Sequence, residues 1–172
     1  INNKKKYFYI SNNFENFIKN LLGVIAIISI FKNPIKFDKN IFYKFRIPEG
    51  RGDIVKIKIK KKNINLIDES YNSNPLSLKS AIENFNSIKT NNKKHMILGD
   101  MLELGKHSKR LHQKMSSIIN STSIDKVNVF GKHIVETYKN IHSQKKGLIL
   151  KENSQIFDLI KNNINNNDYL MI

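Results

Sequence analysis

The sequence predicts an α/β protein whose main domain is a doubly wound, mostly parallel sheet with flanking helices. Two observations predict this fold class. From residue 63 onward, short apolar segments alternate with amphipathic segments of helical length. Hydrophobic residues make up 40% of the chain, which is enough for a packed core and excludes a disordered chain. This Rossmann-like domain is predicted to cover residues 48–172, and residues 1–47 are predicted to be a helical and extended tail of a second domain.

The boundary between the two domains is predicted at the segment "RIPEGRGD", which carries Pro48, Gly50 and Gly52. Ahead of it we expect a strand, a buried helix and a short helix, over residues 4–11, 13–32 and 38–45 respectively. The Asn33-Pro34 pair ends the buried helix. The apolar run 21–31 is shorter than the roughly 20 residues that a membrane span needs, so no stable membrane insertion is expected.

Behind the boundary, the hydrophobic periodicity sets the order of the elements. Residues 53–60 alternate strictly, which predicts a strand with one solvated face, and a turn over 61–63 joins it to a second strand over 64–69 as a hairpin. Pro75 opens a helix, because proline is tolerated in a first turn. The other expected strands are 93–100, 125–131, 146–151 and 168–172, and the expected helices are 75–89, 106–120, 132–141 and 154–164.

Three polar loops follow predicted strands, over residues 68–75, 99–108 and 131–133. Right-handed crossovers place such loops along one edge of a parallel sheet, and ligands bind at that edge in this class of fold. We therefore expect the candidate site to be built from these three loops.

The first loop, "DESYNSNP", holds more polar groups than a helix start requires. Asn74 alone can cap the helix. Asp68 stands at the end of the strand, where a carboxylate can accept hydrogen bonds from ribose hydroxyls. Asn72 and Asn74 each offer a donor and an acceptor. A ligand site and an elaborate cap and turn both explain this loop.

Further candidates lie in "LGDMLELGKHS" and in the boundary segment "RIPEGRGD", residues 46–53, which we call the hinge. Asp100 and Glu103 can bind a cation or a peptide amine, although a solvated loop also explains them. Arg51, between two glycines, can form a bidentate contact to a phosphate or carboxylate, or can be an exposed hinge charge. The five histidines show no metal-ligand spacing, cysteine is absent, and no GxxxxGK[ST] loop is present. No metal site is therefore predicted.

The net charge of +16 raises the question of an anionic partner, either a nucleic acid or a membrane surface. Lysine, asparagine and isoleucine are all abundant, which is typical of a coding sequence rich in A and T, and the basic residues are spread along the chain. We interpret the charge as compositional and expect no nucleic-acid partner. The absence of cysteine fits a reducing, cytoplasmic setting.

Two segments in register, "LIDESYNSNPLSLKSAI" and "ILGDMLELGKHSKRLH", closely resemble the C-terminal domain of the Mur ligases. The branch of this family that adds D-alanyl-D-alanine carries a D-[DE]-x-Y-N-A-N-P run and then an LGDM-x-ELG-x-x-S-x-x-x-H run. "GKHI" at 131–134 stands where that branch has a Gly-Lys pair after a strand. Ser73 replaces the usual alanine. The branches that add single amino acids usually show a D-Y-A-H-x-P type of run instead.

The resemblance implies roles for individual residues. Residues 1–47 would be the end of the central ATPase domain, where Asn20 matches an asparagine near the adenine and Asn16 replaces the expected histidine. Arg51 and Asp68 would contact the nucleotide. The residues on the side of the incoming dipeptide would be Tyr71, Asn72, Asn74, Asp100 and Glu103.

The resemblance also implies a reaction: ATP-driven addition of D-alanyl-D-alanine to UDP-MurNAc-tripeptide, through an acyl phosphate, in peptidoglycan precursor synthesis. ATP and Mg²⁺ would be bound mainly by a part upstream of this chain, so no catalytic residue is expected here. The chain would be a piece of a longer cytoplasmic ligase, supplying the domain that closes over the nucleotide. The alternatives are a stand-alone, non-catalytic binding domain and a piece of a sister Mur ligase.

Overall fold

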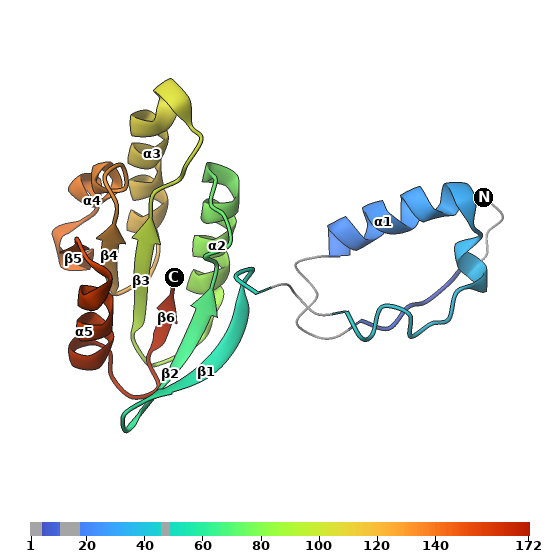
Figure 1. Ribbon diagram of the computed structural model, residues 1–172, viewed down its shortest axis with the longest axis horizontal. Coiled ribbons are helices and arrows are strands. Elements are labelled where there is room, and N and C mark those ends of the chain that lie inside the picture. Colours follow the sequence, from blue (N-terminus) through green and yellow to red (C-terminus); the bar gives the residue numbers. More distant parts are fainter. Residues whose placement is uncertain (1–4, 11–17, 46–48) are drawn as a thin grey trace. The chain divides into compact units, whose positions relative to one another are not determined.

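The structure is a computed structural model that describes residues 5–10, 18–45 and 49–172 (Figure 1). The chain divides into two compact units, Ile1–Pro48 and Glu49–Ile172. Each unit is described separately below.

The second unit contains a six-stranded sheet with the strand order β1-β2-β6-β3-β4-β5 (Figure 1). All neighbouring strands are parallel except β1 and β2, which form an antiparallel hairpin. The strands are β1 (Asp53–Ile59), β2 (Lys62–Asp68), β3 (Lys94–Gly99), β4 (Lys126–Phe130), β5 (Lys146–Leu150) and β6 (Tyr169–Met171). The predicted fold class and the predicted hairpin are both confirmed.

Helices separate the strands, as the alternating pattern predicts. They are α2 (Pro75–Ser87), α3 (Ser108–Asn120), α4 (Val135–Asn140) and α5 (Asn153–Asn163), and short 3₁₀ turns cover Gly105–His107 and Ser143–Lys145. The largest difference from the expected bounds is at α4, where a helix was expected from residue 132.

Two hydrophobic clusters cover the two faces of the sheet. Successive residues of β3 belong to different clusters: Met96 and Leu98 pack with α2 and α3, whereas Ile97 packs with α5. This alternation follows from the two-residue period of a strand, and helices on both faces make every central strand apolar.

Lysines stabilise the ends of the helices at the edge where the parallel strands begin. In a parallel α/β sheet the helices run opposite to the strands, so their unpaired C-terminal carbonyls gather at this edge. Lys62 Nζ donates to the carbonyls of Lys161 (2.9 Å) and Ile164 (2.8 Å) at the end of α5. Lysines also donate to carbonyls in or just after the last turns of α2, α3 and α4, namely Lys94, Lys145 and Lys146. These four lysines therefore have a structural role that needs no anionic partner.

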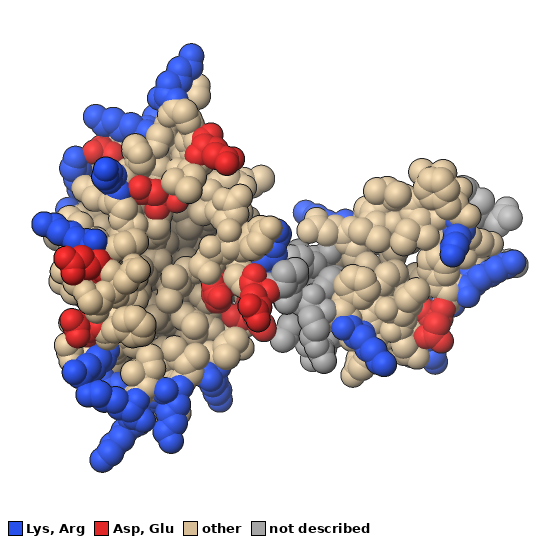
Figure 2. All heavy atoms as spheres, viewed as in Figure 1, with Lys and Arg blue, Asp and Glu red and all other residues tan. Residues whose placement is uncertain are grey.

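Other basic side chains are spread over the surface, with acidic ones among them (Figure 2). On this view the positive charge does not form a single continuous basic face. The absence of a nucleic-acid partner stays a prediction.

The first unit differs from expectation at three places. Residues 5–10 form no strand; Tyr9 N–H donates to Lys39 O (2.8 Å) instead. The helix predicted over 38–45 is wrong, and the segment is a series of turns. Asp38 Oδ1 accepts the Asn40 N–H (2.6 Å), and such a local side-chain bond competes with helix formation.

The third difference concerns α1, which spans Ile18–Phe31. It was predicted to be buried, but Leu21 is its only buried residue, packed with Phe42. Several of its large apolar side chains are exposed: Leu22, Val24, Ile27, Ile30 and Phe31. Among the described residues, no helix is both long and apolar enough to cross a membrane.

Candidate functional site

The candidate site lies at the edge of the sheet where the parallel strands end. Because β2, β6, β3 and β4 are mutually parallel neighbours, the loops after β2, β3 and β4 emerge at the same edge. The predicted grouping of these three loops is thereby confirmed. The loop after β2 is attached to the hinge, and the loops after β3 and β4 are attached to each other.

Backbone hydrogen bonds connect the hinge to the loop after β2. Gly52 N–H donates to Asp68 O (2.7 Å), and Tyr71 N–H donates to Gly50 O (3.2 Å). Between these two bonds, the Arg51 guanidinium stacks over the Tyr71 ring, 4.3 Å from its centroid. The structure thus brings Arg51 to the same place as Asp68 and Tyr71.

Glycine is required on both sides of Arg51. Gly50 and Gly52 have φ values of +76° and +86°, in the region that side chains rarely adopt. A Cβ at Gly50 would lie 2.9 Å from Tyr71 N, and one at Gly52 would lie 2.7 Å from Glu69 Oε1. The two glycines therefore let the hinge backbone approach the loop closely enough for Arg51 to stack.

The two acids at the end of β2 differ in environment. Asp68 is half-buried, and its Oδ1 accepts hydrogen bonds from Ser70 N–H (3.0 Å) and Ser70 Oγ–H (2.5 Å). Burial raises the pKa of Glu69, and the neighbouring Asp68 raises it further, whereas Arg51 opposes the shift. This corner therefore concentrates negative charge, with Arg51 as the nearby compensating cation.

Asn74 caps α2. Its Oδ1 accepts the N–H groups of Leu76 and Ser77, both at 3.0 Å, and Ser77 Oγ accepts the Asn74 N–H in return. The prediction that Asn74 can cap the helix is confirmed. Because its Oδ1 is used by the cap, its amide nitrogen is the group that it can offer a ligand. Tyr71 and Asn72 are exposed just ahead of the cap.

Asp100 joins the loops after β3 and β4. Its Oδ2 accepts the Lys132 N–H (2.9 Å), and its Oδ1 accepts the N–H groups of His133 (2.9 Å) and Ile134 (2.7 Å). Gly131 has a φ of +141°, and a Cβ there would overlap the Asp100 carboxylate. Glu103, three residues after Asp100, is exposed and has a φ of +61°.

His112 is the last residue of the family-like segment "ILGDMLELGKHSKRLH", and no structural role was predicted for it from the sequence. The ring is fully buried, its Nε2 accepts the Met101 N–H (3.1 Å), and its Nδ1 lies 2.8 Å from Ser108 O. This pattern assigns the proton to Nδ1. The four-residue spacing between Ser108 and His112, one helical turn, was the available signal. His112 thereby holds the loop after β3 against α3.

The remaining expectations concern the nucleotide end and metals. Asn20 is exposed on α1 in the first unit, and Asn16 lies outside the described residues. Within residues 5–10, 18–45 and 49–172, no group of three or more His, Cys, Asp or Glu side chains is arranged to hold a metal ion.

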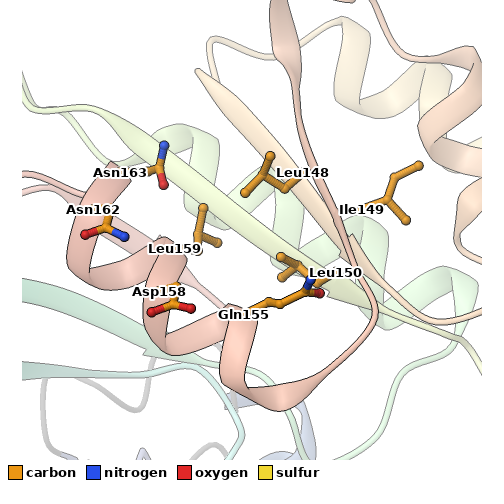
Figure 3. A pocket seen from close by; sticks show the side chains of 8 residues that line it. All are labelled: Leu148, Ile149, Leu150, Gln155, Asp158, Leu159, Asn162 and Asn163. Atoms are coloured by element: carbon orange, nitrogen blue, oxygen red, sulfur yellow. The ribbon is translucent and has the colours of Figure 1, made fainter.

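A pocket of about 290 Å³ lies elsewhere, between the edge strand β5 and α5 (Figure 3). Apolar side chains from both elements and polar side chains of α5 line it: Leu148, Ile149, Leu150, Gln155, Asp158, Leu159, Asn162 and Asn163. None of them is a predicted site residue.

Comparisons with known proteins agree with this arrangement. Residues 50–172 match the family described as Mur ligase, glutamate ligase domain. A UDP-N-acetylmuramoyl-tripeptide–D-alanyl-D-alanine ligase of Rickettsia prowazekii (strain Madrid E) is 32% identical over 150 residues, which cover 80% of this chain and 32% of the relative. A ligase of the same name from Bacillus subtilis (strain 168) is 33% identical over 110 residues, covering 56% of this chain and 24% of the relative.

Solved structures show the same fold. A MurF ligase from Thermotoga maritima, solved in complex with ADP, aligns with a TM-score of 0.67 at 22% identity, covering 90% of this chain and 33% of that one. A MurF from Acinetobacter baumannii aligns with a TM-score of 0.68 at 19% identity, covering 91% and 34%. The chain spans a third or less of the length of these two curated relatives.

Proposed function

This chain belongs to the Mur ligase family, and from that premise we propose that it is part of an ATP-dependent ligase. The reaction would add D-alanyl-D-alanine to UDP-MurNAc-tripeptide in cytoplasmic peptidoglycan precursor synthesis. The names of the curated relatives support this choice of substrates. The observation that carries the proposal is the contact between the hinge and the loop after β2, which holds Arg51 against Tyr71 and bonds Gly52 N–H to Asp68 O at the ligand edge of the sheet.

On the nucleotide side, Arg51 and Asp68 have complementary tasks. The guanidinium would contact the nucleotide phosphates in a fork geometry, and its stacking on Tyr71 limits the freedom it must lose on binding. The Asp68 carboxylate would accept hydrogen bonds from the ribose hydroxyls. Asn20, from the first unit, would lie near the adenine.

On the dipeptide side, polar groups of the loops after β2 and β3 would contact D-alanyl-D-alanine. They are Tyr71, Asn72, the amide nitrogen of Asn74 and the loop from Asp100 to Glu103. Arg51 and the loops after β2 and β3 lie at the same edge of the sheet, so closure of this domain would bring them to the nucleotide together.

The chemistry that this domain would serve is amide formation through an acyl phosphate. Water hydrolyses an acyl phosphate, so a domain that closes over it protects the intermediate. Mg²⁺, which screens phosphate charge in such reactions, would be bound mainly by a part of the ligase outside this chain. The task of the present residues is to bind, orient and exclude water.

A hybrid ligase tests the proposal. The matching segment of the Bacillus subtilis relative would be exchanged for the corresponding residues of this chain, and phosphate release from ATP would be measured. We expect release that requires both UDP-MurNAc-tripeptide and D-alanyl-D-alanine. Arg51→Ala should lower kcat/KM by about tenfold or more, the usual effect of losing a charge-assisted phosphate contact. Arg110→Ala, on the exposed surface of α3, is the matched control.

Two results would contradict the proposal. Turnover with a single amino acid in place of the dipeptide would identify a sister ligase. A hybrid that melts cooperatively and binds UDP-MurNAc-tripeptide, yet releases no phosphate, would favour a non-catalytic binding domain.

A further inference from the structure

We propose that Lys132 binds the carboxylate of the incoming dipeptide while Glu103 receives its ammonium group, and that Asp100 is a positioning residue that holds the Lys132 loop. This inference rests on the proposed function and deepens it. It assigns the two charged ends of the substrate to two different loops of the sheet edge.

The charge pattern of the substrate motivates the assignment. Free D-alanyl-D-alanine is a zwitterion at neutral pH, with an ammonium at one end and a carboxylate at the other. A site that recognises it needs one anion and one cation at a fixed separation. Glu103, exposed after β3, supplies the anion, and the cation comes either from Lys106 of the same loop or from the neighbouring loop after β4.

The Asp100 carboxylate fixes that neighbouring loop. It accepts three consecutive backbone N–H groups, from Lys132, His133 and Ile134, at 2.7–2.9 Å. A carboxylate offers about four lone-pair positions, so most of its capacity is used within the protein. Asp100 therefore acts on a ligand through the loop that it holds.

Lys132 is the cation that this arrangement presents. Its backbone is bonded directly to Asp100, its side chain is exposed, and Glu103 follows Asp100 by three residues. Of the other basic side chains near this edge, Arg51 stacks on the Tyr71 ring, and Lys106 belongs to the loop after β3 and not to the loop that Asp100 holds.

Lys106 provides a matched comparison. It is an exposed lysine of the 3₁₀ turn Gly105–His107, in the same loop as Glu103 and not in the loop after β4 that Asp100 holds. If any positive charge at this edge attracted the substrate, Lys106 and Lys132 would be equivalent. The proposal requires them to differ.

The test is a titration of the ¹⁵N-labelled 172-residue chain, followed by amide chemical shifts, with D-alanyl-D-alanine and with its C-terminal amide. The amide keeps the ammonium but lacks the carboxylate. We expect shifts at residues 99–108 and 131–134 and a preference of about tenfold for the acid, which corresponds to one charge-assisted pair. Lys132→Met should abolish the preference, and Lys106→Met should retain it.

Asp100→Asn tests the positioning role. It should weaken the preference for the acid, and the double variant with Lys132→Met should lose no more than Lys132→Met alone, because both changes act on one interaction. Additive losses would show that Asp100 contacts the dipeptide by itself and would overturn the positioning role.

Three outcomes overturn the assignment of Lys132: equal affinity of the wild-type chain for acid and amide, no shift in either loop at concentrations of about 50 mM, or equal effects of the two lysine variants. These outcomes are separate from the hybrid-ligase assay. An active hybrid combined with any of them leaves the proposed function standing and removes only this inference.

Discussion

Replacing His112 should destabilise the protein strongly, because its buried ring fills space and makes two hydrogen bonds at once. His112→Phe fills most of the space but removes the acceptor for Met101 N–H, and Met101 is itself only 1% exposed. An unsatisfied buried N–H costs about 1–3 kcal/mol. His112→Ala also leaves a cavity, so we expect a total loss of about 3–5 kcal/mol.

Urea denaturation followed by circular dichroism measures both losses as changes in the free energy of unfolding. His107→Ala is the control, because His107 is exposed five residues earlier and its replacement should change stability by less than about 0.5 kcal/mol. A loss below about 0.5 kcal/mol for His112→Phe would refute the reasoning, since the Met101 bond would then contribute nothing.

Three further predictions test local features. Burial lowers the pKa of His95 even though Asp168 Oδ2 lies 3.4 Å from its Nε2, so the unfolded chain binds the proton more readily than the folded chain. The free energy of unfolding should therefore fall as the pH drops below about 6.5. In His95→Gln, the urea-denaturation midpoint should depend less on pH in that range. Lys60 has a φ of +55° in the hairpin turn, a backbone conformation that glycine adopts with less strain than lysine. Lys60→Gly should therefore stabilise the protein by about 0.5–1 kcal/mol and raise its thermal midpoint. An unchanged or lower midpoint would contradict this backbone strain. Asn74→Ala should cost about 1 kcal/mol in the same melts through loss of the α2 cap, whereas Asn72→Ala should cost almost nothing.

The sequence was sufficient for most of the second unit because its elements have clear periods. The strict alternation over 53–60 predicts a strand with one solvated face, and apolar strands separated by amphipathic helices predict a mostly parallel sheet. The structure has both features. Prediction failed where local competition decided the outcome. Around Asp38, a side-chain hydrogen bond to the backbone favours turns over a helix, although the segment contains aromatic residues typical of a packed element.

For the candidate site, the sequence alone determined which residue types follow each strand, and parallel topology was enough to place the three loops at one edge. Only the tertiary structure decided what each side chain does there. Asn74 caps α2, Arg51 stacks on Tyr71, and Asp100 holds the backbone of a loop more than thirty residues away. The reason is physical: local pattern and capping depend on neighbours in the chain, whereas the partner of a carboxylate or guanidinium depends on which distant backbone the fold brings within about 3 Å.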